Sequence, residues 1–284
     1  MWLSSLVERL AKAQVIDRVA EPLKGLVHRV VGQATLKDLL SGKWLGHPLH
    51  PMLTDVPIGS FTSATVLDLV GGARSQRAAD VLVGLGLASA VPTVAAGLAD
   101  WSDTDTGSGR IGVVHAFANG VGLGCYAASL VARARGRRGP GVALGLAGMT
   151  TMTVGGYLGG HLVLARNVGA NAAAYEPVLD TWMEAAGMRT VGEGGSGRVE
   201  VAGAAVLVDR TTARIRAIGD ICTHAGGPLH EGEIDSKAGC VTCPWHASVF
   251  NLADGEVLHG PATVAVAAYE AREADDKIQI RRRS

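Results

Sequence analysis

The chain has 284 residues, enough for two domains, and only 18% of them are charged. Its formal net charge is zero and no extended basic face stands out, so the composition argues against nucleic acid as a partner. The low charge, together with the 39 glycines, instead indicates that part of the chain is built for a membrane.

The first segment, residues 1–45, begins as an amphipathic helix. Leu3, Leu6, Val7 and Leu10 recur at helical spacing among basic residues. Such a helix can lie at a membrane surface, with membrane lipid as its partner, or it can pack on its own protein. The segment lacks the pattern of a secretory signal.

Four apolar stretches follow within residues 46–168. Each is about long enough to cross roughly 30 Å of hydrocarbon at about 1.5 Å per residue. Because these stretches have hardly any polar face, a soluble bundle of buried helices is the weaker alternative. The sequence therefore predicts an N-terminal, all-α domain, a four-helix transmembrane bundle. Its expected spans are 56–72, 81–99, 111–132 and 139–165.

The remainder of the chain has a different texture. After a linker at 169–179, residues 180–284 alternate short β-branched runs with Gly, Asp and Pro turns, which is typical of a small all-β domain. The fold class is therefore two-domain, helical and then β. The runs that predict strands are 199–208, 214–218, 264–266 and 277–280.

Two short motifs in the β region carry metal-binding chemistry. One is Cys222-Thr223-His224, and the other, eighteen residues later, is Cys243-Pro244-Trp245-His246. Two cysteines on one iron and two histidines on the other form the ligand set of a Rieske [2Fe–2S] cluster. Zinc uses the same atoms, but a zinc finger pairs its two cysteines first and its two histidines later. The spacing therefore favours the iron–sulfur cluster.

The loops CTHAGGPLHEGE and CPWHASVFNLADGEV resemble the cluster-binding loops of Rieske-type ferredoxins and of ring-hydroxylating oxygenases. The resemblance implies that Gly227 and Trp245 replace a disulfide-forming cysteine pair found in the Rieske proteins of cytochrome bc complexes. It also implies that Ser248 is kept while Phe250 replaces a tyrosine that donates a hydrogen bond. Fewer donors to sulfur indicate a low-potential, ferredoxin-like centre.

Three other residues of the β region have a metal-binding side chain. Cys240 precedes Cys243 by three residues and is interpreted as a strand residue that binds no metal. His230 and His259 fall in or near turns beside the motifs, and we expect them to be solvated surface side chains.

Four histidines fall in or beside the apolar stretches, at the ends nearer the β domain. His115 and His161 are candidates for axial ligands of a haem b, with His47 and His50 nearby. Three alternatives stay open: a quinone-headgroup site, a metal site that uses Asp55 or Asp100, and interhelical hydrogen bonds such as one to Asn119.

The sequence of the helical region also resembles a family. The HPLHPM run, Asp100-Trp101 and the GGYLGGHLV stretch are similar to a bacterial family of small four-helix membrane proteins with no assigned function. The resemblance covers residues 46–168 and implies the four-span topology, but no activity.

The topology bears on location. An even number of spans puts the N-terminus and the β domain of a multi-pass cell-membrane protein on the same side. Positive residues flank both sides and do not decide the orientation. Because the disulfide pair is missing, we expect the cytoplasmic side.

These features predict a membrane-anchored iron–sulfur protein that performs one-electron transfer with a redox partner protein or a quinone. The alternatives are a redox-sensing membrane module and the electron donor of a separate oxygenase or quinone-linked system. Only 38 residues follow His246, too few for the mononuclear-iron domain of an oxygenase. We therefore expect an electron-transfer component rather than a stand-alone catalyst.

Overall fold

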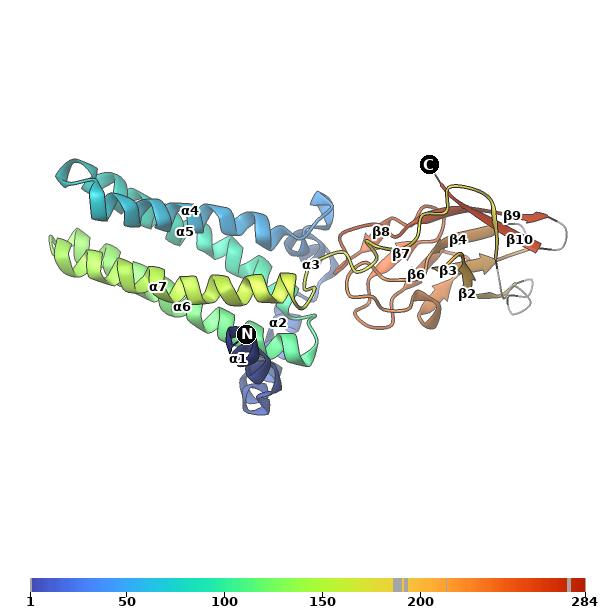
Figure 1. The fold of residues 1–284 in the computed structure, drawn as a ribbon, viewed down its shortest axis with the longest axis horizontal. Coiled ribbons are helices and arrows are strands. Elements are labelled where there is room, and N and C mark those ends of the chain that lie inside the picture. The colour runs from blue at the N-terminus through green and yellow to red at the C-terminus, as the bar shows by residue number, and fades with distance from the viewer. Residues whose placement is uncertain (1, 186–190, 192–193, 213, 275–276, 284) are drawn as a thin grey trace. The chain divides into compact units, whose positions relative to one another are not determined.

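A computed structural model of the chain describes all residues except 1, 186–190, 192–193, 213, 275–276 and 284 (Figure 1). The described chain divides into two compact units. The helical unit comprises residues 1–32 and 49–168, and the β unit comprises residues 33–48 and 169–284. Residues 33–48 thus belong with the β unit although helices precede and follow them in the sequence.

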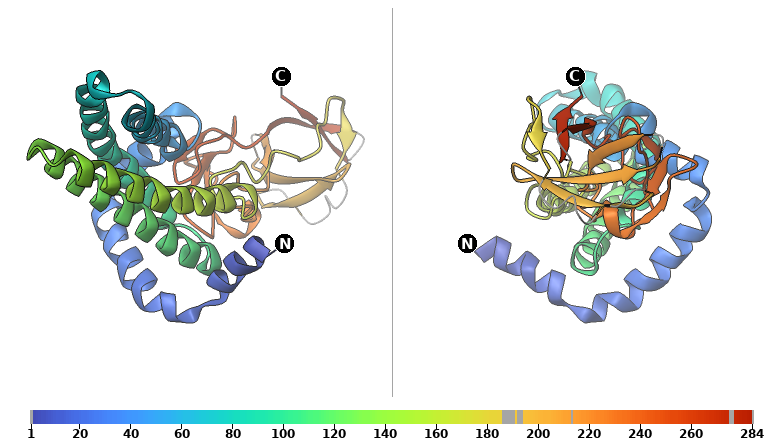
Figure 2. Two further views of the ribbon diagram at one scale, coloured as in Figure 1. Left: turned by 60° about the vertical axis from the view of Figure 1, so that its left-hand side comes forward. Right: turned by 90° about the vertical axis from the view of Figure 1, so that its right-hand side faces the viewer.

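The N-terminal segment forms α1 (Trp2–Lys12) and α2 (Asp17–Val31), which meet at an angle at a short 3₁₀ turn (Figure 2). Val7 and Ala11 are buried against Ile111 and Leu158 of the long helices. The Arg110 guanidinium holds the pKa of the Asp17 carboxyl below its usual value by donating to it at 2.7 Å. Packing on its own protein therefore describes Val7 and Ala11, whereas Leu3 and Leu6 are exposed, so lipid contact at that part of the face stays a prediction.

The rest of the helical unit consists of four long helices that run side by side (Figure 1). The helix α4 packs along α5, and α6 packs along α7. Their bounds are α4 (Leu49–Val70), α5 (Gln76–Trp101), α6 (Thr106–Ala134) and α7 (Arg138–Leu164).

Three of the four predicted spans are long and apolar enough to cross a membrane, within the described residues. They lie in Ala73–Trp101, Thr106–Ala134 and Arg138–Leu164. The helix α4 does not reach the same apolar character, because its 22 residues include His50, Asp55 and Asp68. A fourth span therefore stays a prediction.

The two helical hairpins repeat one another. On α4, His50, Phe61 and Asp68 are separated by 11 and 7 residues; His115, Tyr126 and Arg133 have the same separations on α6. At about 3.6 residues per turn, positions 11 and 18 residues apart share one face of a helix. The Phe61 and Tyr126 rings stack with centroids 3.9 Å apart. The first helix of each hairpin also packs against the second helix of the other, α4 against α7 and α6 against α5. An approximate two-fold axis parallel to the helices therefore relates the hairpins.

The partner helices repeat as well. A Cβ placed on Gly86 of α5 would lie 2.5 Å from the Phe61 ring, and one on Gly148 of α7 would lie 3.0 Å from the Tyr126 ring. Eleven residues further along are Gly97 and Gly159. Each hairpin thus packs an aromatic ring against a glycine of its second helix, because no larger residue fits there.

One end of the four helices is closed by a buried ionic network. Arg133, whose side chain is 1% exposed, pairs with Asp68, which is 4% exposed, and with Asp80 at 3.0 Å. Arg138 donates to both aspartates, and Arg133 also donates to Ser129 at 2.9 Å. Because two arginines meet two aspartates, the buried charges compensate one another, which is the condition for burying them.

The β unit contains two antiparallel sheets. The larger has the strand order β1-β10-β9-β4-β3-β2, and the smaller has the order β5-β6-β7-β8 (Figure 1). The strands of the larger sheet are β1 (Met183–Glu184), β2 (Ser196–Val201), β3 (Ala204–Arg210), β4 (Ile215–Gly219), β9 (Ala268–Ala274) and β10 (Lys277–Arg282). Those of the smaller sheet are β5 (Glu233–Asp235), β6 (Cys240–Thr242), β7 (Val249–Asn251) and β8 (Val257–His259).

Two strand predictions need correction. The run 199–208 is a hairpin rather than one strand, because Ala202 and Gly203 take positive φ of 48° and 86° in a two-residue turn between β2 and β3. The run 264–266 is not a strand, although Val266 is buried and donates to the Gly255 carbonyl at 3.0 Å. The runs 214–218 and 277–280 do form β4 and β10.

Residues 33–48 pack on the β unit through α3 (Ala34–Ser41). Asp38 of α3 accepts from the Gly260 N–H at 2.8 Å and lies 3.2 Å from Nδ1 of His259. Lys43 donates to the Leu258 carbonyl at 2.5 Å. A segment distant in sequence thus holds the end of β8 and the loop after it.

Candidate metal centre

The first metal-binding motif lies in a tight loop after β4. The Cys222 N–H donates to the Gly227 carbonyl at 2.9 Å, and the Gly226 N–H donates to the Cys222 carbonyl at 2.8 Å. Gly226 has a φ of 82°, which only glycine adopts without cost. The Thr223 hydroxyl ties the loop to the Val264 carbonyl at 2.6 Å.

The second motif lies in a loop of the same construction after β6. The Cys243 N–H donates to the Ser248 carbonyl at 2.8 Å, and the Ala247 N–H donates to the Cys243 carbonyl at 3.1 Å. Ala247 has a φ of 58° at the place that Gly226 takes in the first loop. Both loops therefore close with the same two hydrogen bonds, and each holds one cysteine and one histidine of the predicted ligand set.

The fold brings the two loops together. Cys222 and Cys243 are buried in one cluster with Phe250, and neither forms a disulfide. The His224 and His246 rings meet edge to face with centroids 4.9 Å apart, and both are only partly buried. Two thiols on the inside and two imidazoles nearer the surface form a donor set with two distinct ends.

Backbone N–H groups of each loop point at its sulfur. The Cys222 sulfur accepts from the His224 and Ala225 N–H groups, and the Cys243 sulfur accepts from those of Trp245 and His246. The Cys222 thiol, together with these N–H groups, lowers the pKa of Cys243 to about 6 although the side chain is buried. The Cys243 sulfur and burial raise the pKa of Cys222. The Cys243 loop is thus prepared for a sulfur anion, the form that binds metals.

This donor set fits a two-iron cluster better than one ion. Among the residues that the structure describes, no three His, Cys, Asp or Glu side chains converge as ligands of a single ion would. A structural zinc site needs four ligands around one centre, whereas each iron of a Rieske cluster takes only two protein ligands. The two sulfurs at one end of this site can bind one iron, and the two imidazoles at the other end can bind the second.

Gly227 and Trp245 face each other across the two loops. A Cβ on Gly227 would lie 2.9 Å from Cys243 Sγ and 3.1 Å from the Trp245 ring. The indole, 56% exposed, therefore rests on the glycine at the places where the resemblance puts a disulfide. The contact between the loops here is steric rather than covalent.

Ser248 and Phe250 lie under the second loop. The Ser248 hydroxyl oxygen is buried and accepts from the Ala262 N–H at 2.9 Å, so its own O–H can donate elsewhere. Phe250 of β7 is fully buried beside both cysteines and has no hydroxyl to donate. Only one of the two side-chain donors considered in the sequence is therefore present.

The other sulfur and imidazole groups nearby have structural partners. Cys240 lies in β6 opposite Asn251, in keeping with its interpretation as a strand residue. His259 is exposed, as expected, and lies near Asp38. His230 is not simply solvated: its Nδ1 lies 2.7 Å from the fully buried Asp220 carboxylate, which also accepts the His230 N–H. The expectation that His230 is a solvated surface side chain is therefore wrong, because the sequence alone does not show that Asp220 is buried beside it.

The histidines of the apolar region have separate surroundings. His115 Nδ1 lies 2.8 Å from the Gly155 carbonyl, and His50 Nδ1 lies 2.9 Å from the Thr93 carbonyl. His161 Nε2 lies 3.8 Å from Glu8, and His47 Nδ1 lies 3.1 Å from the Pro48 carbonyl.

The proposed partnership of His115 with His161 does not suit the rotation of α7. The His115 ring packs on Gly159, where a Cβ would lie 3.0 Å away. His161 follows two residues later and is turned by roughly 200° around the helix. Haem ligation by this pair gains no support, and sequence could not show which face of α7 meets α6.

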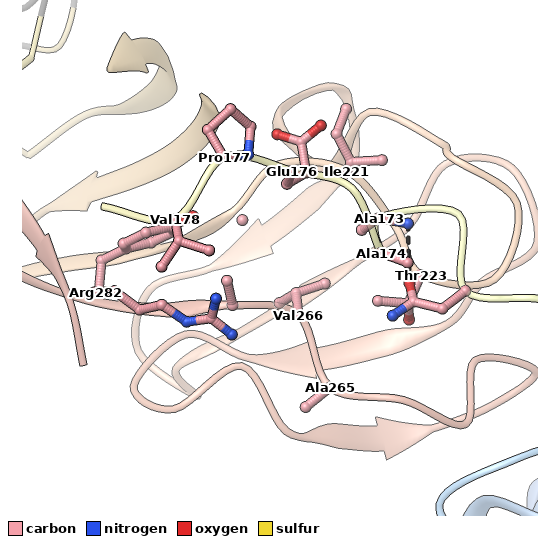
Figure 3. A pocket seen from close by; sticks show the side chains of 14 residues that line it. Ala173, Ala174, Glu176, Pro177, Val178, Ile221, Thr223, Ala265, Val266 and Arg282 are labelled. Carbon is pink, nitrogen blue, oxygen red and sulfur yellow. Dashed lines mark hydrogen bonds between the residues drawn. The ribbon is translucent and has the colours of Figure 1, made fainter. Parts of the chain in front are cut away.

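A small pocket lies elsewhere on the β unit, beside the first loop (Figure 3). Glu176 and Arg282 are among its lining residues, with Thr223 at one end. The Ala172 N–H donates to the Thr223 carbonyl at 3.0 Å, so residues 169–179 brace the outside of the cluster loop. Glu176 also accepts from the Ala205 N–H at 3.2 Å.

The geometry defines a cysteine and histidine site of the iron–sulfur class. Comparison with known proteins identifies the two domains: residues 181–270 match the Rieske [2Fe-2S] domain, and residues 46–172 match a predicted membrane protein (DUF2231). The chain therefore joins a Rieske [2Fe–2S] domain to a predicted membrane domain, which confirms both resemblances.

Similar proteins include ferredoxins of dioxygenases. Ferredoxin CarAc of Metapseudomonas resinovorans is 29% identical over 100 residues, 35% of this chain and 92% of that protein. The ferredoxin subunit of anthranilate 1,2-dioxygenase from Burkholderia cepacia is 29% identical over 75 residues, 26% of this chain and 68% of that subunit. The β unit is thus a ferredoxin-like Rieske domain, and this supports electron transfer.

The chain spans much less of some other relatives. Apoptosis-inducing factor 3 of Mus musculus is 30% identical over 83 residues, 29% of this chain and only 13% of that protein. Among solved structures, the ferredoxin of carbazole 1,9a-dioxygenase from Nocardioides aromaticivorans IC177 is 24% identical, with a TM-score of 0.34. It covers 37% of this chain and all of its own length.

Proposed function

We propose that the protein is a membrane-anchored one-electron carrier whose [2Fe–2S] cluster is held by Cys222 and Cys243 on one iron and His224 and His246 on the other. The observation that carries the proposal is the pair of equivalent loops, each of which offers one thiol and one imidazole. When bound, such a cluster accepts and releases one electron. The protein's own residues set where and how readily this occurs.

The burial of the ligand side chains determines from which side a redox partner can exchange electrons with the cluster. The two cysteines are 1% and 3% exposed, so solvent and partners are kept from the sulfur end. The two histidines are only partly buried, and Trp245 beside them is 56% exposed. A redox partner therefore approaches from the imidazole side, where the distance to the cluster is shortest.

We assign a low, ferredoxin-like potential to this centre. Hydrogen bonds to sulfur stabilise the reduced cluster and so raise the potential. Phe250 provides no donor, and the Gly227 and Trp245 contact replaces a covalent shield. Two relatives are named as ferredoxins, which supports the ferredoxin-like part of this assignment.

We further propose that all four long helices cross the cell membrane. The helix α4 is 22 residues long, about 33 Å at roughly 1.5 Å per residue. Its Asp68 is neutralised by Arg133 and Arg138, so this carboxylate does not oppose insertion. The N-terminus and the Rieske domain then share one side, which we take as the cytoplasm.

The partner that we propose is a redox protein or a quinone. Two similar proteins are ferredoxin components of dioxygenase systems, which supports delivery of electrons to a separate oxygenase; a quinone-linked system is the other partner system that we propose. A redox-sensing role, in which the cluster state changes helix packing, is the second candidate and would apply if no partner exchanged electrons at a useful rate.

The test is an EPR spectrum of the dithionite-reduced, detergent-purified protein, with iron and sulfide analysis. We expect a Rieske signal with two non-haem irons per chain, lost in Cys222→Ser and His246→Ala. Cys240→Ser and Cys125→Ser are the matched controls and should keep the signal. Retention of the signal in Cys222→Ser, or its loss in Cys240→Ser, would refute the ligand assignment.

A further inference from the structure

The helical unit has a second pair of histidines, which are related by the repeat of its two hairpins. His50 of α4 and His115 of α6 occupy equivalent positions of the two hairpins. His50 bonds through Nδ1 to the Thr93 carbonyl at 2.9 Å, and His115 bonds through Nδ1 to the Gly155 carbonyl at 2.8 Å. One rule thus places both rings: each bonds to a main-chain oxygen of the second helix in its own hairpin.

The same two helices make room for the rings. A Cβ on Gly97 would lie 2.7 Å from the His50 ring, and one on Gly159 would lie 3.0 Å from the His115 ring. In both cases the glycine stands four residues, about one helical turn, after the residue whose carbonyl is bonded. Any side chain at either glycine would displace the imidazole, so the packing fixes the position of each ring.

These bonds fix the proton on each ring. A carbonyl oxygen has no hydrogen, so Nδ1 must be the donor in both histidines. In the neutral ring Nε2 then has a lone pair and no proton. Donation from the other ring nitrogen to a carbonyl is the arrangement that orients histidines toward a metal.

The two rings face a common region. Each histidine lies eleven residues before one ring of the stacked Phe61 and Tyr126 pair, and therefore on the same face of its helix as that ring. Asn119 lies one turn after His115 and donates through Nδ2 to the His115 main-chain carbonyl at 3.0 Å. The same Nδ2 lies 3.3 Å from Nε2 of the His115 ring, so this region is polar. The stacked Phe61 and Tyr126 rings close it on one side, eleven residues or about 16 Å along the helices.

The number and kind of donors select the ligand. Quinone carbonyls need hydrogen-bond donors, which Nε2 in this tautomer is not. A bare metal ion needs further protein ligands, and the described residues contain no group of three that could hold one. A haem iron brings four nitrogens of its own and takes two axial imidazoles.

We propose that His50 and His115 are the axial ligands of one haem b held between the two helical hairpins. The site would be a second one-electron centre in addition to the Rieske cluster, and its assignment does not rest on the cluster. It replaces His161 with His50 as the partner of His115. The two-fold arrangement explains why one ligand comes from each hairpin.

The experiment is a titration of the detergent-solubilised full chain with haemin, followed by optical and EPR spectra. We expect one haem per chain with a six-coordinate, low-spin spectrum. His50→Ala and His115→Ala should each give a high-spin spectrum that added imidazole returns to low spin. His161→Ala and His47→Ala are matched controls and should stay low-spin.

A second measurement is needed if the alanine variants fail to fold. His115→Met keeps a sixth ligand and should raise the haem potential in a redox titration. Failure of the wild-type chain to take up stoichiometric haem, or loss of the low-spin spectrum in His161→Ala but not in His50→Ala, would overturn the proposal. The Rieske signal recorded in the same samples reports the cluster separately, so the two proposals can fail independently.

Discussion

Gly227 provides the sharpest test of how the two cluster loops fit together. We consider the change Gly227→Ala. The added Cβ would lie 2.9 Å from Cys243 Sγ and 3.1 Å from two atoms of the Trp245 ring. Favourable contacts between heavy atoms begin at roughly 3.5 Å, so the loops would have to separate by about 0.6 Å. Both loops are closed by main-chain hydrogen bonds, which leave little freedom for such a movement.

The expected cost follows from overpacking. Inserting one methyl into a well-packed interior destabilises a protein by about 1–3 kcal/mol. Since about 1.4 kcal/mol is a tenfold change in an equilibrium constant, retention of the cluster should fall by roughly five-fold to a hundred-fold. The Trp245 indole, being exposed, can move and relieve part of the clash, whereas Cys243 cannot move without displacing a ligand.

The assay is the iron and sulfide content per chain during dilution into a chelator, together with the thermal midpoint of the β unit in the full chain. Gly219→Ala is the matched control. Gly219 is also in the β unit, has no positive φ, and a Cβ there meets its nearest atom at an ordinary 3.5 Å. If Gly227→Ala retained iron and sulfide as well as Gly219→Ala does, the steric account of the two loops would be refuted.

Three further predictions test other parts of the molecule. Phe250→Tyr should raise the cluster potential by about 20–60 mV, the equivalent of one net hydrogen bond, in an EPR-monitored redox titration; an unchanged or lower value would contradict the low-potential argument, and Phe250→Leu is the control. Arg133→Met should destabilise the helical unit by up to about 3–5 kcal/mol, because Asp68 loses a buried partner. A double-mutant cycle of Arg133→Met with Asp68→Asn should show a smaller loss for the double variant than the sum of the two single losses in thermal unfolding, and simple addition of the two single effects would argue against their pairing. Asp105→Ala should cost about 0.5–2 kcal/mol, because Asp105 caps α6 by accepting from the Gly107 and Ser108 N–H groups at 2.8 and 3.1 Å. Although burial acts to raise it, these bonds and Arg166 hold the pKa of Asp105 below its ordinary 3.8, so the cap is complete above pH 3.8 and is lost as the pH falls through the lower folded value. A wild-type minus Asp105→Ala stability difference that did not shrink in acid would count against this cap.

The cluster loops could be predicted because their chemistry is local. Each loop carries its cysteine and histidine within four residues, so the motif can be read although the second loop turns at Ala247 and not at a glycine. Alternating β-branched runs also predicted β4 and β10. The hairpin at Ala202 and Gly203 was missed because an alanine gives no turn signal; the one signal was Gly203, a single glycine inside an apolar run.

Long-range pairing was harder to predict. The rotation of each long helix decides which histidine faces another, and the spans are apolar on all sides, so their periodicity gives no facing direction. The signal that would have helped is the repeat: His, aromatic and charged residues with the same spacings on α4 and α6. A search for internal repeats finds His50 as the counterpart of His115, whereas proximity in depth suggested His161.

The way in which the β unit is assembled limits how it can be separated from the rest. Its two pieces, residues 33–48 and 169–284, are interrupted by the long helices. A fragment that starts at residue 169 would lack Asp38 and would leave the Gly260 N–H without its carboxylate partner. A soluble version of the Rieske domain should therefore supply residues 33–48 as a fused or added peptide. For the same reason, insertion of this domain into another membrane protein would require two graft points instead of one.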